Sequence, residues 1–591
     1  MRVEFFPCGE KYKNPVGGVE VNADFTVSAV CDEANEAYFV LTKESETPVR
    51  YPMKDCGGGK FSFTMRVTSS GLYFYHFAFV VSGEERKVFA NEDLCASESG
   101  KDEWQLTAYK SRYRAPEFLR GGIFYQIMPD RFNRGGKRYK TKKNAVYRED
   151  TSVCPYYLPD ENGIVRNNDM FGGNLDGVTE KLDYLKSLSV KCIYLNPVFE
   201  AASNHKYDTG SYRRVDGDFG GEDALKNLIK EAEKRGIKVI LDGVFSHTGD
   251  DSVYFNRYGN YDSVGAYQSE HSPYFDWYDF NAFPSDYKCW WGIKILPCVN
   301  ETNVRYDEFI NGEDGIIRYY MRMGIAGWRL DVADELPDAF IDNLTRAAKS
   351  VNPEALVLGE VWEDASNKTA YGFRRRYLQG AQLDSVTNYP FKNAVIDFVN
   401  TGDAKGLKRT VCRVVNNYPK RVLDNLMNFL GTHDTVRILN ALSSDSVPKE
   451  KSARADYKIS DRELAVQKLK AAAALQYTLP GVPCLYYGDE AGMEGYEDPF
   501  NRRFFPWLSR DESLTDYYRA LGKLRALKEL NGGSIKIINA EKGVFSFVRG
   551  ASLKIVSNMG KCAYELNSVV TDLITGEELS VLSPLKTIAF Y

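Results

Sequence analysis

The sequence predicts an α/β protein: a parallel (β/α)8 TIM barrel with a subdomain inserted after its third strand, an N-terminal β-sandwich and a small C-terminal β-domain. Three observations lead to this prediction. The chain has 591 residues, more than one hydrophobic core usually supports. Its long middle part alternates short apolar runs with amphipathic segments of helical period, which is typical of βα units. Both ends of the chain show β-rich runs separated by turns instead.

The predicted domains are residues 1–118 (N-terminal β-sandwich), 119–530 (barrel, including the inserted subdomain 248–304) and 531–591 (C-terminal β-domain). In the first domain, β-rich runs at 61–66 and 72–81 are separated by a Ser-Ser-Gly turn. The last domain alternates in the same way at 543–548 and 553–556. Such runs with glycine-rich turns favour antiparallel β-structure.

Eight apolar runs supply the strands of the predicted barrel. They lie at 122–128, 191–195, 238–241, 327–330, 356–358, 384–386, 426–429 and 484–487. Between the second and third runs, residues 222–235 place their apolar side chains at helical spacing and end at Gly236, as an amphipathic helix does. Residues 248–304 are rich in aromatics and have no helical period, so they are interpreted as the insertion. A doubly wound open sheet is the alternative architecture.

Composition excludes several classes of function. The formal net charge of −5 gives no electrostatic case for nucleic acid or an anionic membrane surface. No apolar run approaches the roughly 20 residues of a membrane helix. The eleven cysteines include no C-x-x-C pair, which argues against a disulfide scaffold or a zinc module. With no apolar signal-peptide core at the N-terminus, these features predict a cytoplasmic protein.

Polar residues directly after the apolar runs are the candidates for chemistry. Asp242 ends the third run, Asp331 follows the fourth, Glu360 follows the fifth, and His433 with Asp434 follows the seventh. In a barrel these positions share the carboxyl-terminal rim, where active sites form. Any one such carboxylate is more often a helix cap or part of a loop turn, and a buried structural Arg–Asp network is a further non-catalytic interpretation. The occurrence of four such positions favours a site.

The strand positions of the carboxylates predict a mechanism. Asp331 and Glu360 follow neighbouring strands, which lie about 4.8 Å apart in a sheet. Two such groups can approach to about 5–5.5 Å, the separation of retaining glycosidases, whereas inverting enzymes need about 6.5–9.5 Å. Arg329 shares the strand face of Asp331 and can keep it ionised as a nucleophile. Glu360 would act as the acid, with a raised pKa, and Asp434 would stabilise positive charge.

At these residues the chain resembles the α-amylase family of glycoside hydrolases, and within it the neopullulanase, cyclomaltodextrinase and maltogenic amylase group. The resemblance covers nearly the whole chain. Its motifs are IFYQIMPDRF at 123–132, SNHKYDT at 203–209, DGVFSH at 242–247, GWRLDVADE at 327–335, GEVW at 359–362, LGTHD at 430–434 and DPFNRR at 498–503. Each motif is short, but their ordered set is specific.

The resemblance implies the same three roles: nucleophile Asp331, acid/base Glu360 and stabiliser Asp434. It also implies substrate-binding residues, namely Tyr207, Asp242, His247, Arg329, Trp362, His433, Asp498 and Arg502. The substrate would be an α-glucan oligosaccharide cleaved mainly at α-1,4 bonds. The N-terminal sandwich of this group often mediates dimerisation, so a homodimer is expected. Taken singly, core packing would be the favoured interpretation of Tyr207 and Trp362, and a surface ion pair that of Asp498 and Arg502.

Three departures from the group bear on function. The loop that helps set substrate preference reads LPCVN at 296–300, and Asp334 replaces a common Asn. The calcium loop of the group is acidic, whereas residues 133–140 read NRGGKRYK, and Asn174 stands where Asp is usual. Hard cations want carboxylate and carbonyl oxygens. No cofactor is required for the chemistry, and the calcium site is expected to be absent or weak.

Other functions on the same scaffold stay open at this point. An α-amylase/pullulanase, an α-1,6-glucosidase or a glucanotransferase would use the same covalent intermediate and the same motifs. A catalytically inactive carbohydrate-binding protein is the non-enzyme alternative. Loss of one of the three carboxylates would indicate it, and the sequence retains all three.

Overall fold

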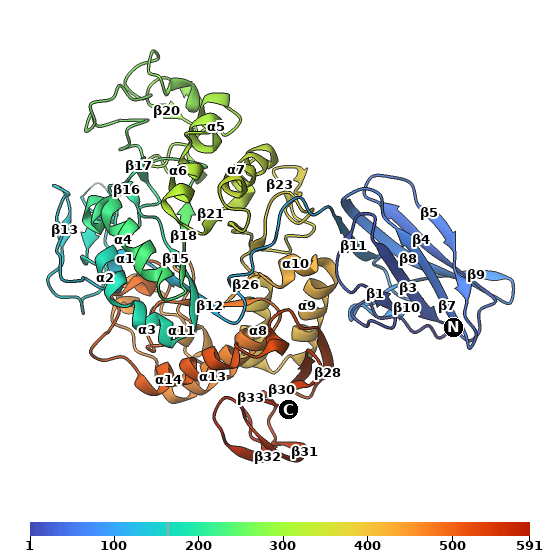
Figure 1. Ribbon diagram of the computed structural model, residues 1–591. Coiled ribbons are helices and arrows are strands. Elements are labelled where there is room, and N and C mark those ends of the chain that lie inside the picture. Colours follow the sequence, from blue (N-terminus) through green and yellow to red (C-terminus); the bar gives the residue numbers. More distant parts are fainter. Residues whose placement is uncertain (162, 164) are drawn as a thin grey trace.

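A computed structural model describes residues 1–161, 163 and 165–591 of the chain. Figure 1 shows a central barrel, a separate β-domain at the N-terminal end and a small β-domain at the C-terminal end. Within the described residues, no helix is long and apolar enough to cross a membrane. All eleven cysteines are free thiols.

The N-terminal domain consists of two largely antiparallel sheets that pack face to face, with an aromatic core between them. One sheet has the order β1 (Lys13–Asn14), β3 (Asp24–Val30), β7 (Lys60–Arg66) and β6 (Lys54–Asp55). The other contains β10 (Ala96–Ser97), β9 (Glu84–Ala90), β8 (Gly71–Val81), β11 (Trp104–Tyr109) and β2 (Val19–Glu20), and in it β4 (Glu36–Lys43) pairs with β8 and β5 (Val49–Pro52) pairs with β4. Phe77 and Trp104 lie in the core between them. This is the predicted sandwich architecture.

The eight central strands form a parallel sheet that closes on itself. Their order is β25 (Ser385–Val386), β22 (Leu356–Gly359), β21 (Gly327–Leu330), β18 (Lys238–Gly243), β15 (Val190–Leu195), β12 (Ile123–Ile127), β27 (Val482–Tyr486) and β26 (Met427–Phe429). A parallel bridge between Thr387 and Met427 joins the two ends of this order. Closure confirms the barrel and excludes the doubly wound alternative, which would leave two free edges.

Helices surround the barrel because their apolar faces cover its strands. They are α1 (Pro129–Phe132), α2 (Leu175–Glu180), α3 (Leu182–Ser187), α4 (Gly221–Glu233), α5 (Val304–Asn311), α6 (Ile316–Met323), α7 (Asp338–Val351), α8 (Tyr389–Thr401), α9 (Ala404–Asn417), α10 (Lys420–Leu423), α11 (Ile438–Leu442), α12 (Lys451–Ala455), α13 (Arg462–Thr478) and α14 (Glu512–Leu524). The helix expected over 222–235 is α4, which buries Ala224, Leu225, Leu228, Ile229 and Ala232.

Long loops after several strands carry short two-stranded sheets. Three of these are antiparallel: β16 (Phe199–Ala201) with β17 (Thr209–Val215), β19 (Phe280–Ala282) with β20 (Asp286–Tyr287), and β23 (Thr369–Ala370) with β24 (Phe373–Arg374). In the fourth, β13 (Val146–Tyr147) pairs in parallel with β14 (Asp169–Met170). The segment between β18 and α5 contains β19 and β20 and stands out from the barrel in Figure 1. It occupies the place of the predicted insertion.

The C-terminal domain is a four-stranded antiparallel sheet with an added hairpin. The sheet has the order β28 (Ile535–Glu541), β29 (Val544–Arg549), β30 (Leu553–Asn558) and β33 (Lys586–Phe590), and the hairpin pairs β31 (Tyr564–Thr571) with β32 (Glu578–Leu582). It packs against the barrel helices: Thr587 of β33 donates a hydrogen bond to the carbonyl oxygen of Ala471 in α13. The small β-domain expected at this end is therefore present.

Candidate active site

One guanidinium joins three carboxyl groups at the carboxyl-terminal rim of the barrel. Nη1 of Arg329 lies 2.7 Å from Oδ1 of Asp331 and 2.8 Å from Oδ1 of Asp242. Nη2 lies 2.8 Å from Oε2 of Glu360. The pairing of Asp242, Arg329 and Leu358 across three neighbouring strands sets this geometry. Asp331 and Glu360, the two carboxyl groups expected to carry the chemistry, therefore both pair with Arg329.

The loop after β21 holds Glu360 from a second side. The backbone N–H of Val332 donates to Oε2 of Glu360 at 2.9 Å. Val332 has φ +34°, in the left-handed region that a β-branched residue rarely adopts. From the opposite direction, the indole N–H of Trp362 donates to Oε1 at 3.2 Å. Backbone strain beside a functional carboxylate is a pattern of active sites.

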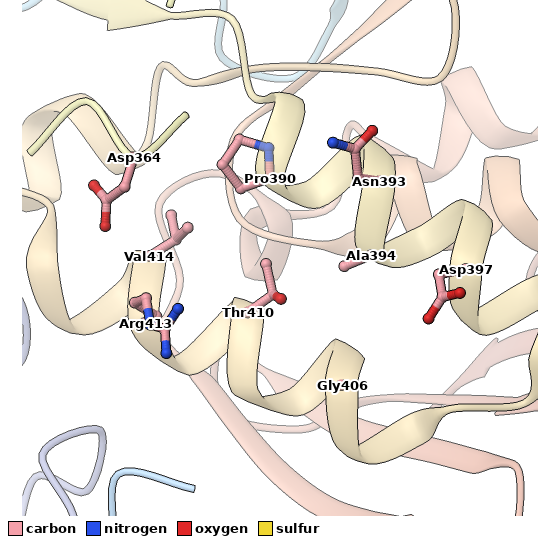
Figure 2. A pocket seen from close by; sticks show the side chains of 9 residues that line it. All are labelled: Asp364, Pro390, Asn393, Ala394, Asp397, Gly406, Thr410, Arg413 and Val414. Atoms are coloured by element: carbon pink, nitrogen blue, oxygen red, sulfur yellow. The ribbon is translucent and has the colours of Figure 1, made fainter. Parts of the chain in front are cut away.

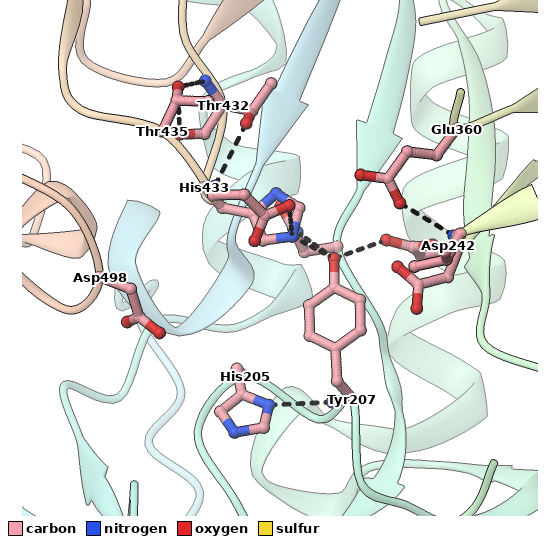
Figure 3. A network of polar contacts seen from close by, with 12 residues as sticks. His205, Tyr207, Asp242, Glu360, Thr432, His433, Thr435 and Asp498 are labelled. Carbon is pink, nitrogen blue, oxygen red and sulfur yellow. Dashed lines mark hydrogen bonds and ion pairs between the residues drawn. The ribbon is translucent and has the colours of Figure 1, made fainter. Parts of the chain in front are cut away.

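Tyr207 links the carboxylate cluster to His433, as Figure 3 shows. Its hydroxyl donates to Oδ2 of Asp242 at 2.9 Å and is hydrogen-bonded to Nε2 of His433. On the far side of that ring, Nε2 of Gln126 lies 2.9 Å from Nδ1 of His433. With the amide as donor, the ring carries its proton on Nε2, which leaves His433 neutral. Burial lowers the pKa of His433 well below its usual value.

Asp434 lies on the open side of the cluster and keeps a third of its side chain exposed. Its carboxylate is 3.2 Å from Nε2 of His433 and 3.5 Å from Nη2 of Arg502. Arg502 also pairs with Asp498 at 3.0 Å and donates to the carbonyl oxygen of His433 at 3.0 Å. The loop after β27 thus contacts the loop after β26, and the residues expected at the next sugar position adjoin Asp434.

Burial dominates the electrostatics of the cluster. Desolvation raises the pKa of Asp331 well above its usual value, the neighbouring Glu360 raises it further, and Arg329 acts in the opposite direction. Burial likewise raises the pKa of Asp242 and takes that of Asp434 to about 7. The expected effect of Arg329 on Asp331 therefore acts against burial and against Glu360. Three carboxyl groups around a single guanidinium favour holding a proton within the cluster.

His247 is close to the site but almost fully enclosed. It is 2% exposed. Its Nε2 hydrogen-bonds the carbonyl oxygen of Tyr207 at 3.1 Å, and its Nδ1 lies 3.1 Å from Oγ of Ser246. Burial lowers its pKa to about 4. His247 therefore positions the loop of Tyr207, and its expected contact with sugar stays a prediction.

Several residues at the site were not anticipated from the sequence. Gln126 holds His433, Asn196 donates to the Tyr207 hydroxyl at 3.0 Å, and Tyr194 donates to Asp242 at 2.6 Å. Each sits in or directly after a buried barrel strand. A polar residue inside an otherwise apolar strand was the available signal, because buried polar groups need partners.

Aromatic side chains of the insertion form one flank of the site. Trp290 and Trp291 stack with ring centroids 4.5 Å apart, and Trp290 lies 5.5 Å from the ring of His247. Glu335 accepts hydrogen bonds from the Trp291 indole N–H at 3.2 Å and the Tyr371 hydroxyl at 2.6 Å. This carboxylate ties the insertion to the β23–β24 hairpin.

The segment expected to have lost its calcium site is held by its own side chains. Nδ2 of Asn174 donates to the carbonyl oxygens of Arg134 and Lys137. The guanidinium of Arg134 donates to the carbonyl oxygens of Arg148, Glu149 and Phe171. Among the described residues, no group of three His, Cys, Asp or Glu side chains is arranged to hold a metal ion. Protein donors therefore occupy oxygens that a cation would need.

A groove between α8 and α9 lies outside this cluster (Figure 2). It is lined by Asp364, Pro390, Asn393, Ala394, Asp397, Gly406, Thr410, Arg413 and Val414. The lining contains no aromatic ring on which a sugar face could stack. The groove is therefore a poor second site for a glucan, and the carboxylate cluster is the candidate active site.

Comparison with known proteins places the chain in a family. The family described as "Alpha amylase, catalytic domain" matches residues 126–517, more than half of the chain. Neopullulanase 2 of Thermoactinomyces vulgaris is 31% identical over 85% of this chain and 82% of its own length. The matched residues include the carboxylate cluster, namely Asp242, Asp331 and Glu360 with Arg329. The chain belongs to the α-amylase family.

The chain is also similar to a solved structure and to a larger protein. The type III pullulan hydrolase from Thermococcus kodakarensis superposes with a TM-score of 0.69 at 26% identity, covering 100% of both chains. An amylopullulanase of Thermoanaerobacter thermohydrosulfuricus is 37% identical over 77% of this chain. The chain spans only 33% of that amylopullulanase's length, so the match concerns one part of a larger protein.

Proposed function

We propose that this protein is a retaining, endo-acting α-glucan hydrolase that cleaves mainly α-1,4-glucosidic bonds by double displacement. The observation that carries the proposal is the sharing of Arg329 by Asp331 and Glu360, at 2.7 and 2.8 Å. Two carboxyl groups on one guanidinium are close neighbours, as a covalent glycosyl mechanism requires. In an inverting enzyme a water would have to fit between them.

In the first step, a carboxylate oxygen of Asp331 attacks the anomeric carbon as the bond to the glycosidic oxygen breaks. Glu360 donates its proton to that leaving oxygen. In the second step, Glu360 takes a proton from water, the water oxygen bonds to the anomeric carbon, and Asp331 leaves. Asp434 faces the sugar ring as positive charge develops and stabilises the oxocarbenium-like transition state.

The side chains around the carboxylates would bind the glucan. Tyr207 and His433 form one wall, with His247 behind them, and the sugar on the cleaved side would sit against this wall. Asp498 and Arg502 would bind the next sugar outward. Trp362, stacked on Tyr389 with ring centroids 4.3 Å apart and half-exposed, offers a face for the departing sugar.

The substrates proposed are maltooligosaccharides, cyclodextrins, pullulan or starch fragments. Relatives named neopullulanase and cyclomaltodextrinase, and the pullulan hydrolase neighbour, support cyclic and pullulan-type substrates. The alternative is cleavage of other linkages in pullulan, which the similarity to proteins named amylopullulanase supports. Products released from pullulan and from β-cyclodextrin distinguish these activities, and products longer than the substrate would indicate glucanotransfer.

The mechanism is tested by the configuration of the first product. Proton NMR of maltoheptaose hydrolysis should show the α-anomer first, before mutarotation. Asp331→Asn should lower kcat by about a thousandfold or more, because the nucleophile acts only in the chemical step. Asp397→Asn, an exposed carboxylate on α8, is the matched control and should leave kcat unchanged. A β-anomer appearing first would overturn the double displacement.

The oligomeric state and location form part of the proposal. A homodimer through the N-terminal sandwich would restrict access to short or cyclic glucans, and a cytoplasmic location would suit the eleven free thiols. Light scattering at micromolar concentration should give twice the 66.9 kDa chain mass. A monomeric mass would remove the dimer. No metal is part of the proposed mechanism.

A further inference from the structure

A second cavity lies at the opposite end of the barrel from the carboxylates. Its volume is about 290 Å³, and it is lined by Ala115, Pro116, Glu117, Leu119, Arg120, Lys420, Arg421, Asp424, Asn425, Val482, Arg525, Leu530, Asn531 and Gly532. Leu119 and Asn425 precede β12 and β26, and Val482 begins β27. The cavity therefore faces the amino ends of the strands, where barrel enzymes do not place their chemistry.

Most charges in this lining are paired, and one cation is not. Arg120 pairs with Glu117 at 3.1 Å, and Lys420 pairs with Asp424 at 2.7 Å. Arg421 lies 3.4 Å from Asp384, a carboxylate outside the lining. Arg525 has no carboxylate partner among the residues that the structure describes. Buried guanidiniums are normally paired with an anion.

The side chain of Arg525 is buried and incompletely bonded. It is 2% exposed. Its Nη1 and Nη2 donate to the carbonyl oxygens of Tyr477 and Gly481, each at 3.1 Å. Within the described part of the chain, its Nε has no acceptor. A buried cation whose donors are incompletely bonded is costly to a fold, and an anion beside this side chain would offset that cost.

A second arginine repeats the pattern beside the first. Arg549 of β29 is 1% exposed and donates to the carbonyl oxygens of Thr478 and Gly533, the latter at 3.3 Å. Its Nε also has no acceptor in the described chain. Burial lowers the pKa of Arg525 to about 10 and that of Arg549 to about 9, and the charge of Arg525 lowers the latter further. An anion here would relieve the repulsion between the two guanidiniums.

We propose that this cavity is a binding site for a phosphate-class oxyanion, held by Arg525 with Arg120 and Arg421 at its rim. A planar guanidinium matches the geometry of a tetrahedral oxyanion with several acceptor oxygens. The cavity also has room for more than a monatomic ion. Its wall is preformed, because Asn531 accepts from the N–H of Gly121 at 2.7 Å and donates to the carbonyl oxygen of Arg525.

The location predicts what the anion does. The lining contains the segment that enters the barrel from the sandwich, the start of two barrel strands, and the turn that leads to the C-terminal domain. An anion bound there joins these three parts and stabilises their folded arrangement by mass action. Since the carboxylates lie at the other rim, hydrolysis should not depend on it. The site is a stability site.

The test compares thermal unfolding in sodium phosphate with that in sodium chloride at equal ionic strength. The parent protein should show a Tm that rises with the logarithm of phosphate concentration beyond the chloride control. Arg525→Gln and Arg120→Gln should each need about tenfold more phosphate for the same rise, the loss of one charged hydrogen bond. Arg213→Gln, an exposed arginine in another basic groove, should behave as the parent does.

Each outcome decides the proposal. Arg120 is exposed, so its replacement keeps the test valid if Arg525→Gln does not fold. Equal Tm rises in chloride and phosphate for the parent, or equal rises in the parent and both lining variants, would overturn the site. Glucose 1-phosphate in place of inorganic phosphate separates the sources: a similar rise assigns the site to phosphomonoesters, and a rise with inorganic phosphate alone assigns it to the free ion.

Discussion

Three carboxyl groups and one guanidinium leave the candidate site with excess negative charge. Arg329 neutralises one of the three, and burial makes two further ionised groups unfavourable. A proton held within the cluster reduces that charge. A shared proton of this kind suits a mechanism in which one carboxyl group donates a proton while its neighbour attacks as an anion.

Burial and Glu360 raise the pKa of Asp434 while Arg502 lowers it, and this opposition gives a prediction for pH dependence. Asp434 must be ionised to stabilise positive charge, and its pKa is raised to about 7, chiefly by burial, while Arg502 lowers it. The acid limb of kcat/KM should therefore lie near pH 7 in the parent. Arg502→Gln removes the opposing charge, so the limb should move to higher pH by up to about one unit. Measuring kcat/KM against pH on maltoheptaose checks this.

The control for that experiment is Arg503→Gln, because Arg503 donates to the carbonyl oxygen of Ala455 and not to Asp434. Its acid limb should stay in place. A limb that moves to lower pH in Arg502→Gln would contradict the assignment.

The effect of Asp434 on the free energy of unfolding has the opposite pH dependence to that of most carboxylates. Because its pKa is raised in the folded state, the folded state binds the proton more tightly than the unfolded state does. The contribution of Asp434 is therefore present at low pH and is lost as pH rises through about 7.

The sequence predicts which residues belong to the candidate site more completely than it predicts the contacts between them. Arg329 and Asp331 lie two apart on one strand, so their pairing follows from the strand period. The contact of Arg329 with Glu360 depends on the register between β21 and β22, which no local pattern encodes. Gln126 was missed because its partner, His433, is 307 positions away in the chain.

At the scale of elements, the loop at 133–140 predicts how the protein responds to chelators. Asn174 and Arg134 already donate to five carbonyl oxygens of this region, so a calcium ion has little to gain there. Removing divalent cations with EDTA should therefore leave Tm and kcat unchanged. A fall in Tm with EDTA, restored by calcium, would show that an ion is bound.

Arg134→Ala tests whether side-chain hydrogen bonds or a bound cation stabilise this loop. The variant frees three carbonyl oxygens, and leaving them without a donor should lower the free energy of unfolding by about 1–3 kcal/mol. Lys143→Ala, at an exposed position three residues after this loop, is the surface control. Added calcium should not restore the variant if the segment has lost its ion site.

Elements with a strong local signal were predicted closely, and weakly encoded ones were not. The helical spacing of 222–235 predicts α4 (Gly221–Glu233) to within two residues at each end. Between the first two barrel strands, residues 175–187 form two short helices, α2 and α3, that are separated at Lys181. The strand β25 has only two residues. Its place beside β26 depends on one bridge, from Thr387 to Met427, which is a tertiary contact.

At the scale of the whole molecule, polar groups hold the N-terminal sandwich against the barrel. Nε2 of Gln105 donates to Oγ of Ser366 at 2.8 Å, and Glu44 pairs with Arg374 at 2.8 Å. Figure 1 shows the sandwich beside α9 and α10. Such a polar interface is poorly visible in sequence, because its residues read as ordinary surface groups. It also contains one charge that burial makes unfavourable.

That charge is Lys13, which is fully buried and donates to Oδ1 of Asn416 in α9 at 2.7 Å. Burial lowers its pKa to about 7, whereas an unfolded lysine titrates near about 10.4. Between these values the unfolded chain binds more protons, so stability should rise with pH by up to about 1.4 kcal/mol per unit. Lys13→Met should abolish this rise, because it removes the titrating group.

The difference in Tm between Lys13→Met and the parent should therefore change with pH. Near pH 7 the variant avoids burying a charge and should be at least as stable as the parent. As pH rises toward about 10 the parent's lysine becomes neutral, and the variant, which leaves Oδ1 of Asn416 without this donor, should become the less stable of the two. Lys54→Met, at an exposed position of the same domain, should keep a constant difference. A constant difference for Lys13→Met as well would mean that Lys13 is not buried at this interface in solution.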